Sequence, residues 1–252
     1  TCALPICLKD ARNVKIITEY LRDLGFEFLF ATFTAPNCSQ QELKEEITAY
    51  NKSLERMFKR QKYNFIKGYI RKLEITYNND SSSKSYGTFH PHFHVLIAID
   101  KSYFGRKYVS KQEWLVDWQK AMRDSSITQI DIKKVSLDSL KNNIDKSILE
   151  LTKYITKDFD FYSEIDVFES FYKGTKGKQM FAFSGIFRDA KKKLKNKELE
   201  KYVDSKKEIE WFYLFTQIYN QDKYIVKQES NIELLKCLLA SDYSTENIND
   251  EE

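Results

Sequence analysis

The chain has 252 residues, of which 42% are hydrophobic and 31% are charged, ordinary proportions for a soluble globular protein. Its 7 Gly and 3 Pro exclude a collagen-like or linker-rich chain, and no apolar run reaches the roughly 18–20 residues that cross a bilayer. The formal net charge is +4, although residues 244–252 hold four acids and no base. The basic remainder is compatible with a polyanionic partner.

The compartment can be inferred from the first residues and from the cysteines. Residues 1–10 lack the basic-then-apolar layout of a signal peptide, and the 4 Cys are too few and too irregularly spaced for a disulfide framework. We therefore expect a cytoplasmic protein with no membrane partner. Because the chain begins at Thr1 and not at Met, we also expect a missing upstream segment.

The first strand is expected at residues 26–34, where FEFLFATFT is dense in aromatic and β-branched residues. A helix is expected from Ser39, as its N-cap, to about Lys62, because apolar residues recur at helical spacing. Two strands follow at 66–77 and 88–99. The polar stretch between them predicts a mobile hairpin loop.

The second half of the core is expected to begin with a helix at about 110–123. Ser110 and Glu113 stand in the spacing of a capping box at its start. A strand at 127–135 and a helix at 137–156 come next. Further helical segments are expected at 159–172, 208–219 and 232–239, around a basic run at 191–197.

This order of elements predicts an α+β fold, in which helices pack on a central, mainly antiparallel β-sheet and a helical C-terminal region follows. We expect four parts in the chain. They are an N-terminal segment at 1–25, the core at 26–160, a helical C-terminal extension of the same catalytic region at 161–243, and a disordered acidic tail at 244–252.

All three histidines of the chain lie in the motif HPHFHVLIAI. Alternate side chains of a strand share a face, so His90, His92 and His94 project together and Phe93 and Val95 point to the opposite face. Two imidazoles at i and i+2 form a rigid arm for a divalent metal. The alternative is a set of histidines that decorates a hairpin edge. Because every His falls on one stripe, we favour metal binding.

The absence of further histidines from the sequence indicates which metal ion the site would bind. Zinc hydrolases built on a His-x-His strand generally need additional His ligands, and this chain has none left. The remaining ligands would be carboxylates, Gln, Cys or water, which favours Mg²⁺ or Mn²⁺ and phosphate chemistry. Glu74, on the strand expected to pair with the histidine strand, is the candidate third ligand. The alternative is an exposed strand acid beside Lys72.

A second group of residues lies in SILELTKYITK. On a helix, Glu150 and Tyr154 share a face, as do Tyr154 and Lys157. Alone, such a Tyr is usually a core residue. Beside a metal site, its oxygen could attack a phosphodiester as a covalent nucleophile. Lys157 would then offset phosphate charge, and Glu150 could activate water for a hydrolytic step.

Three motifs resemble those of the HUH endonucleases, and more specifically the replication initiator (Rep) proteins of small rolling-circle plasmids of Gram-positive bacteria. They occur in the family's order: FLFATFTAPN resembles the first motif, HPHFHVLIAI the metal motif, and ELTKYITK the nucleophile motif with an acid four residues before the Tyr. The resemblance covers about 27–157, with a weaker echo in KGKQMFAFSGIFRDA. Family members often carry a Cys-rich N-terminal segment, whereas here Cys2 and Cys7 are poorly spaced for a zinc knuckle.

The resemblance implies an HUH endonuclease fold and a DNA nickase and strand transferase. Tyr154 would nick one strand at the double-strand origin and keep a 5′-phosphotyrosyl link. Glu150 would activate water at termination, and Lys157 would be the basic residue that often follows the Tyr.

The resemblance also implies a metal and partners. His92 and His94 would bind Mg²⁺ or Mn²⁺, with Glu74 or His90 completing the site. The partners would be DNA, both the plasmid origin and its single-stranded nick site, and a host helicase.

DNA binding should depend on phosphate contacts from Lys and Arg and should therefore be sensitive to salt. For each basic residue alone, a solvated surface position is the alternative. The candidates are Lys59, Arg60, Lys62, Lys191, Lys192 and Lys193.

Other functions compete with the rolling-circle initiator. A conjugative relaxase or a tyrosine transposase of the same superfamily would use the same chemistry. A non-catalytic DNA-binding replication-control protein would need the histidine stripe only for structure. An unrelated metal-dependent hydrolase would act on small phosphoesters without Tyr154.

Overall fold

A computed structural model describes residues 4–105, 107–135, 147–148, 151, 165–203, 214–220 and 223–229. Among these residues, no helix combines the length and the apolar character that a membrane span requires.

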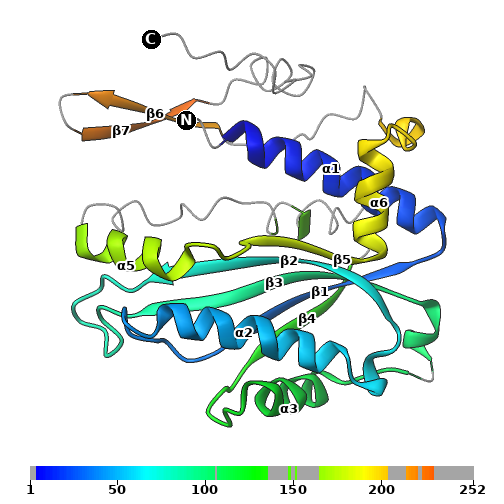
Figure 1. The fold of residues 1–252 in the computed structure, drawn as a ribbon, viewed down its shortest axis with the longest axis horizontal. Coiled ribbons are helices and arrows are strands. Elements are labelled where there is room, and N and C mark those ends of the chain that lie inside the picture. The colour runs from blue at the N-terminus through cyan, green and yellow to red at the C-terminus, as the bar shows by residue number, and fades with distance from the viewer. Residues whose placement is uncertain are drawn as a thin grey trace.

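A five-stranded sheet in the order β4-β1-β3-β2-β5 forms the centre of the fold (Figure 1). Every neighbouring pair of its strands is antiparallel. The strands are β1 (Glu27–Thr34), β2 (Ile66–Tyr77), β3 (Phe89–Ile99), β4 (Ile130–Val135) and β5 (Phe181–Gly185).

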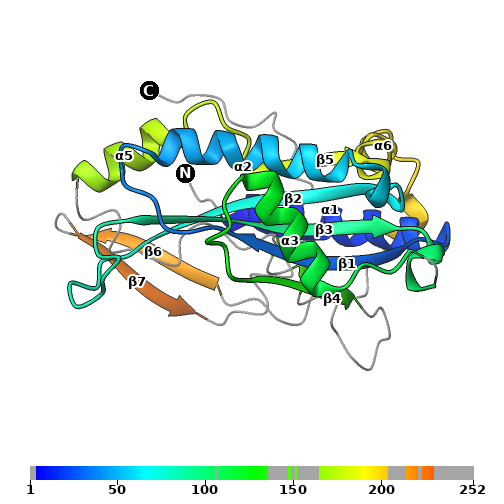
Figure 2. The ribbon, with the colours of Figure 1, turned by 90° about the horizontal axis from the view of Figure 1, so that it is seen from below.

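Helices cover both faces of this sheet (Figures 1 and 2). One face carries α1 (Leu4–Asp23) and α6 (Ile186–Lys195), which contact each other. The other carries α2 (Leu43–Phe58) and α3 (Lys111–Met122), with α5 (Ile165–Thr175) beside α2. Short 3₁₀ helices lie at Gln61–Tyr63, Lys101–Phe104 and Glu200–Tyr202, and β6 (Leu214–Asn220) pairs with β7 (Lys223–Glu229).

The alternation of side chains in β3 produces two separate cores. Odd-numbered residues such as Phe93 and Val95 are buried among α2 and α3, where Tyr50 and Trp118 anchor the helices to the sheet. Even-numbered residues beyond the histidines are buried with α1 and α6 instead. Both layers therefore depend on one strand, which explains why β3 is apolar along most of its length.

Most expected elements are confirmed. The sequence placed the first three strands of the sheet within one residue of β1, β2 and β3, and it predicted the capping box of α3, in which Ser110 accepts from the backbone N–H of Glu113. The predicted α+β class, with helices on an antiparallel sheet, is confirmed as well. The fourth strand is shorter than expected because β4 begins only at Ile130.

The expected helix from Ser39 to Lys62 is wrong at both ends. Ser39 donates its backbone N–H and its hydroxyl to Glu42 at 2.9 and 2.6 Å in a preceding turn, and Glu42 itself is the N-cap of α2. At the other end, Arg60 adopts an extended conformation, and Tyr63 lies in a separate 3₁₀ turn that buries its ring.

The C-terminal third differs most from expectation. The predicted helix at 208–219 is wrong where the structure describes it, because residues 214–220 form strand β6. The predicted helix at 159–172 corresponds to α5, which begins at Ile165. Most of the predicted helix at 137–156 and all of that at 232–239 lie outside the described residues, as does the tail at 244–252.

Two elements were not anticipated. The segment before residue 26 forms α1, whose buried residues Val14, Ile17 and Leu21 recur at helical spacing. Strand β5 comes from beyond residue 160 and completes the edge of the central sheet next to β2. The proposed division of the chain at 160 stays a prediction.

The junction of β5 and α6 requires glycine. Gly185 has φ +55° and pairs with Gly68 of β2. A Cβ on Gly185 would lie 2.2 Å from the carbonyl oxygen of Lys67 and 2.8 Å from Cα of Gly68. Gly177 is a natural comparison, because it also has a positive φ, +75°, but its Cβ would meet no atom within 4 Å.

We expect Gly185→Ala to lower the free energy of unfolding by more than Gly177→Ala does. The second change costs only the strain of a left-handed residue, about 1 kcal/mol, whereas the first adds a backbone clash and should cost about 3 kcal/mol. Urea denaturation measures both losses. Equal losses would mean that the close approach of β2 to β5 is unimportant.

Candidate metal site

The candidate metal ligands lie on one face of the β2–β3 pair. Glu74 of β2 stands directly opposite His92 of β3, and Lys72 stands opposite His94. Lys72 and Glu74 lie two residues apart on β2, as His92 and His94 do on β3, and alternate side chains of a strand share a face. All four side chains therefore project from the same side of the sheet. This is the face covered by α1 and α6.

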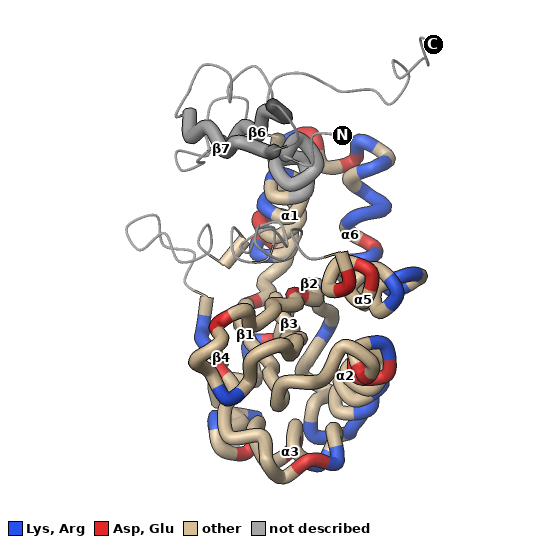
Figure 3. The backbone as a smooth tube through the Cα atoms, turned by 90° about the vertical axis from the view of Figure 1, so that its left-hand side faces the viewer, with Lys and Arg blue, Asp and Glu red and all other residues tan. Residues whose placement is uncertain are grey.

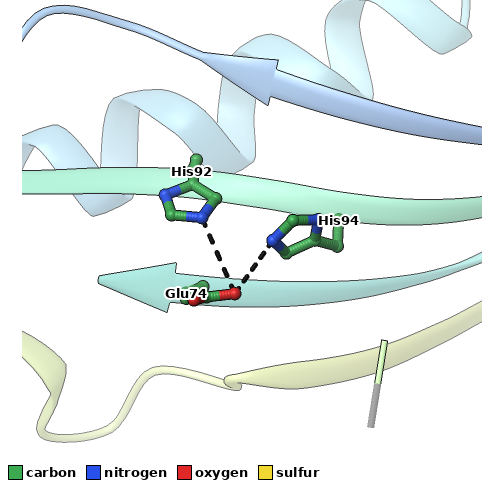
Figure 4. Close-up of side chains that lie close together, drawn as sticks. All are labelled: Glu74, His92 and His94. Carbon is green, nitrogen blue, oxygen red and sulfur yellow. Dashed lines mark ion pairs between the residues drawn. The ribbon is translucent and has the colours of Figure 1, made fainter. Parts of the chain in front are cut away.

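The carboxylate of Glu74 approaches both imidazoles (Figure 4). Its Oε2 lies 2.9 Å from Nε2 of His94 and 3.6 Å from Nε2 of His92. Each of the three residues offers one ligand atom, and these atoms all lie within 4.8 Å of one another. Glu74 and His94 are only 8% and 6% exposed, so the cluster is held by its packing.

Neighbouring groups orient the two rings. Nδ1 of His92 lies 3.3 Å from the carbonyl oxygen of His90, and Nδ1 of His94 lies 3.3 Å from the hydroxyl of Thr32 on β1. Because a carbonyl oxygen only accepts, Nδ1–H of His92 can donate to it in the tautomer that leaves Nε2 to bind a cation. The ring of Phe30 stacks on His94 with centroids 5.9 Å apart.

A buried lysine stands beside the carboxylate. Nζ of Lys72 lies 3.8 Å from Oε2 of Glu74, and Lys72 is 5% exposed. Burial by itself raises the pKa of Glu74, but His92, His94 and the charge of Lys72 outweigh burial and hold the pKa well below its usual value. Glu74 is therefore ionised at neutral pH.

These residues suit a divalent cation. Two imidazole nitrogens and one ionised carboxylate oxygen converge, and a cation between them would neutralise the carboxylate and take one ligand atom from each of the three residues. The His–His–Glu cluster is consistent with an HUH-like metal site.

The remaining expected site residues fall into two groups. His90 lies one step along β3, its ring 5.4 Å from that of His92, and is not part of the three-residue cluster. Tyr154, Glu150 and Lys157 lie outside the described residues. Leu151, three residues before the tyrosine, is buried in the core that α1 and α6 share.

The first trio of expected DNA-binding residues, at the end of α2, is engaged with acids. Lys59 Nζ lies 2.7 Å from Glu55, Arg60 lies 3.0 Å from Asp117, and Lys62 lies 2.9 Å from Asp117. Helix α2 packs on the face of the sheet opposite the metal cluster. Their role in DNA binding stays a prediction.

The second trio lies on α6, on the same face as the cluster. In Figure 3, basic residues follow one another along this helix, whereas acidic and basic segments mix on α2 and α3. Lys191 lies over the ring of Phe183 at 4.2 Å, and Lys193 pairs with Glu198 at 2.9 Å. Lys192 lies between them in sequence and is exposed.

Sequence reasoning missed the groups that support the cluster. Lys72 shares the face of Glu74 because it lies two residues earlier on the same strand, so strict alternation would have found it. Thr32 and Phe30 could not be found from their own positions, because their contact with His94 depends on the pairing of β1 with β3.

Comparison with known proteins identifies the family to which the chain belongs. The chain matches the family described as Replication protein (Rep_1) over residues 5–225, which is most of its length. The chain belongs to this family of plasmid replication proteins. The resemblance to Rep proteins of Gram-positive bacteria is thereby confirmed. No solved structure matches the chain.

Three curated relatives illustrate the match, each named Protein rep. The protein from Staphylococcus aureus is 42% identical over 164 residues, which cover 64% of this chain and 67% of the relative. The protein from Bacillus sp is 34% identical, covering 63% and 55%, and that from Streptococcus pneumoniae is 32% identical, covering 69% and 53%. The chain thus spans little more than half the length of the last two.

We expect Mn²⁺ to raise the melting temperature of the wild-type protein, because a ligand that binds the folded state stabilises it. Glu74→Gln should remove most of this rise, since the amide carries no charge for the cation. His90→Gln is the matched control and should keep it, because His90 lies outside the cluster. If Mn²⁺ raised the melting temperature of Glu74→Gln as much as that of the wild type, the metal would bind elsewhere.

Proposed function

We propose that this protein initiates rolling-circle replication of a plasmid by nicking one DNA strand at the origin. The observation that carries the proposal is the buried convergence of Glu74, His92 and His94, in a chain that belongs to the Rep_1 family. A cluster of this composition, with the nucleophile motif elsewhere in the sequence, fits metal-assisted phosphoryl transfer better than a structural histidine stripe.

Tyr154 is the proposed nucleophile. Support comes from its motif and from Leu151, which is buried on the face of the sheet that carries the cluster. Mg²⁺ or Mn²⁺ held by Glu74, His92 and His94 would supply the positive charge that polarises the scissile phosphate. Lys157 would offset the charge of the bound strand.

The nicking step exchanges one phosphate ester for another. The phenol oxygen of Tyr154 attacks phosphorus, and the bond from phosphorus to the 3′ oxygen breaks. The 3′ oxygen leaves as a hydroxyl, so the proton that it gains balances the one lost by the phenol. The 5′ end stays attached to the protein as a phosphotyrosine, and the free 3′-hydroxyl can prime synthesis.

Termination by water would release the protein. Glu150 would accept a proton from a water that attacks the phosphotyrosine, and the phenol oxygen of Tyr154 would leave. A carboxylate in this role makes a second nucleophilic tyrosine unnecessary.

Helix α6 is the proposed contact to the DNA backbone. It lies on the face of the cluster and carries Lys191, Lys192 and Lys193. The weaker part of the family resemblance, KGKQMFAFSGIFRDA, spans β5 and the start of this helix. A strand bound along α6 would place phosphates against lysines and leave its neighbouring nucleotides near the metal cluster.

We expect Tyr154→Phe to abolish covalent attachment of DNA, because the phenyl ring has no oxygen to attack phosphorus. The protein is incubated with a randomised single-stranded DNA library and Mn²⁺, and the adduct is measured on a denaturing gel and located by mass spectrometry. Tyr172→Phe is the matched control, since Tyr172 is an exposed tyrosine of α5, and should form the adduct at the wild-type rate.

An adduct that survives in Tyr154→Phe would transfer the role of nucleophile to another residue. If the wild type forms no adduct with the library or with a supercoiled plasmid that carries the origin, yet still binds DNA, the protein is a non-catalytic replication-control protein.

We expect the Lys191→Ala/Lys192→Ala variant to bind single-stranded DNA more weakly than the wild type. Its salt dependence should be shallower by roughly 0.7 for each phosphate that the removed lysines neutralise in the wild type. Lys173→Ala is the control, because Lys173 pairs with Glu169 on α5, on the opposite side of the sheet. Fluorescence anisotropy across a salt series measures both effects. If both variants lost the same affinity for DNA, the lysines of α6 would not be the specific contact to the DNA backbone.

A further inference from the structure

A polar hollow of about 350 Å³ opens where β2 and β3 meet the hairpin that joins them. Thr76 and His90 contribute to its lining and stand opposite each other in the strand pairing. This pair lies two residues along the strands from the pair of Glu74 and His92. Two residues of a strand span about 7 Å. Through Thr76 and His90 the hollow reaches the face of the cluster at a distance comparable with one nucleotide, whereas Tyr77, which also lines it, packs against the core on the opposite face.

The hairpin forms a braced wall of this hollow. Asn78 donates its side-chain amide to the hydroxyls of Ser83 and Ser85 at 2.9 Å each, and its carbonyl side-chain oxygen accepts from the backbone of Asp80 at 3.0 Å. Its main chain bonds to Gly87 and Thr88. These bonds connect the lining residues to one another within the hairpin, and the mobility expected of this loop stays a prediction.

The lining is polar and uncharged. None of the described residues that line the hollow is Lys, Arg, Asp or Glu. Amides from Asn37 and Asn79, hydroxyls from Thr76 and Ser85, and the imidazole of His90 can both donate and accept hydrogen bonds. A phosphate would call for cationic side chains, whereas the edge of a nucleobase presents donors and acceptors together and is read by amides in this way.

We propose that this hollow recognises a base of the single-stranded origin next to the nicked phosphate. The inference rests on the proposed nicking function, since it names how the same site selects its sequence. Tyr86 follows Ser85 in the hairpin and is 52% exposed. An exposed ring at this point can stack a neighbouring base without regard to its identity.

The proposal is tested with a randomised single-stranded DNA library in the presence of a chelator, so that binding is measured without nicking. Bound sequences are counted for the wild type, Thr76→Val and Asn79→Ala. Thr76→Ser keeps the hydroxyl, and Ser81→Ala changes an exposed residue of the same hairpin outside the hollow. Melting temperatures of all variants show that each is folded.

We expect the first two variants to lose roughly tenfold in base preference at one or two positions of the selected sequence. Thr76→Ser and Ser81→Ala should retain the wild-type preference. Tyr86→Ala should instead weaken binding of all sequences by roughly tenfold, and Tyr86→Phe should not. An unchanged preference at every position in Thr76→Val and Asn79→Ala overturns the proposal.

The adduct assay separates this inference from the proposed function. A wild type that forms the Tyr154 adduct but shows no base preference overturns the base-recognition site alone. A wild type with a preference that depends on the hollow but with no adduct overturns the nicking function and supports the site. A wild type that neither binds single-stranded DNA nor forms an adduct overturns both.

Discussion

The antiparallel register between β2 and β3 is the constraint on which the rest of the molecule depends. It places Glu74 opposite His92 and Lys72 opposite His94, so the ligands and their counter-charge share a face. A slip of one residue would turn the side chains of either strand to the opposite face. The slip would also expose Phe93, Val95 and Ile97, and the free energy of burying them therefore fixes the geometry of the metal cluster.

The side chains of β3 point alternately to the two faces of the sheet, and each face packs against a different layer of helices. Its odd-numbered residues complete the core beneath α2 and α3, where Tyr50 donates to the carbonyl of Pro91 and Trp118 donates to that of Thr34, each at 2.7 Å. These bonds attach both helices to strand segments next to the histidines. The even-numbered face carries the metal ligands, and from Leu96 onward its residues are buried with those of α1 and α6.

The two basic trios show why charge in a sequence is a poor guide to a nucleic-acid surface. Arg60 and Lys62 neutralise Asp117, whose other neighbour is the hydroxyl of Tyr63 at 2.9 Å. Burial alone would raise the pKa of Asp117, but these partners lower it, so the carboxylate stays charged within the fold. On α6, Phe187 and Ala190 are buried, Lys192 is exposed, and Lys193 pairs with Glu198.

The sequence by itself determined the composition of the candidate site and most of the central sheet. His90, His92 and His94 had to share a face in any strand, and the apolar run after them had to be buried. Glu74 could be named because a polar hairpin loop joins two strands of similar length, so that they pair with each other.

Only the tertiary structure decided which of these residues meet. His90 is left out of the cluster because the register carries Glu74 to His92 and His94, and a register depends on the whole of both strands. The same holds for β5, a short aromatic segment that becomes a strand because the edge of β2 is open to it and because Gly68 and Gly185 allow the close approach. Contacts between distant segments depend on how all the surrounding side chains pack, and a local sequence pattern carries no information about that packing.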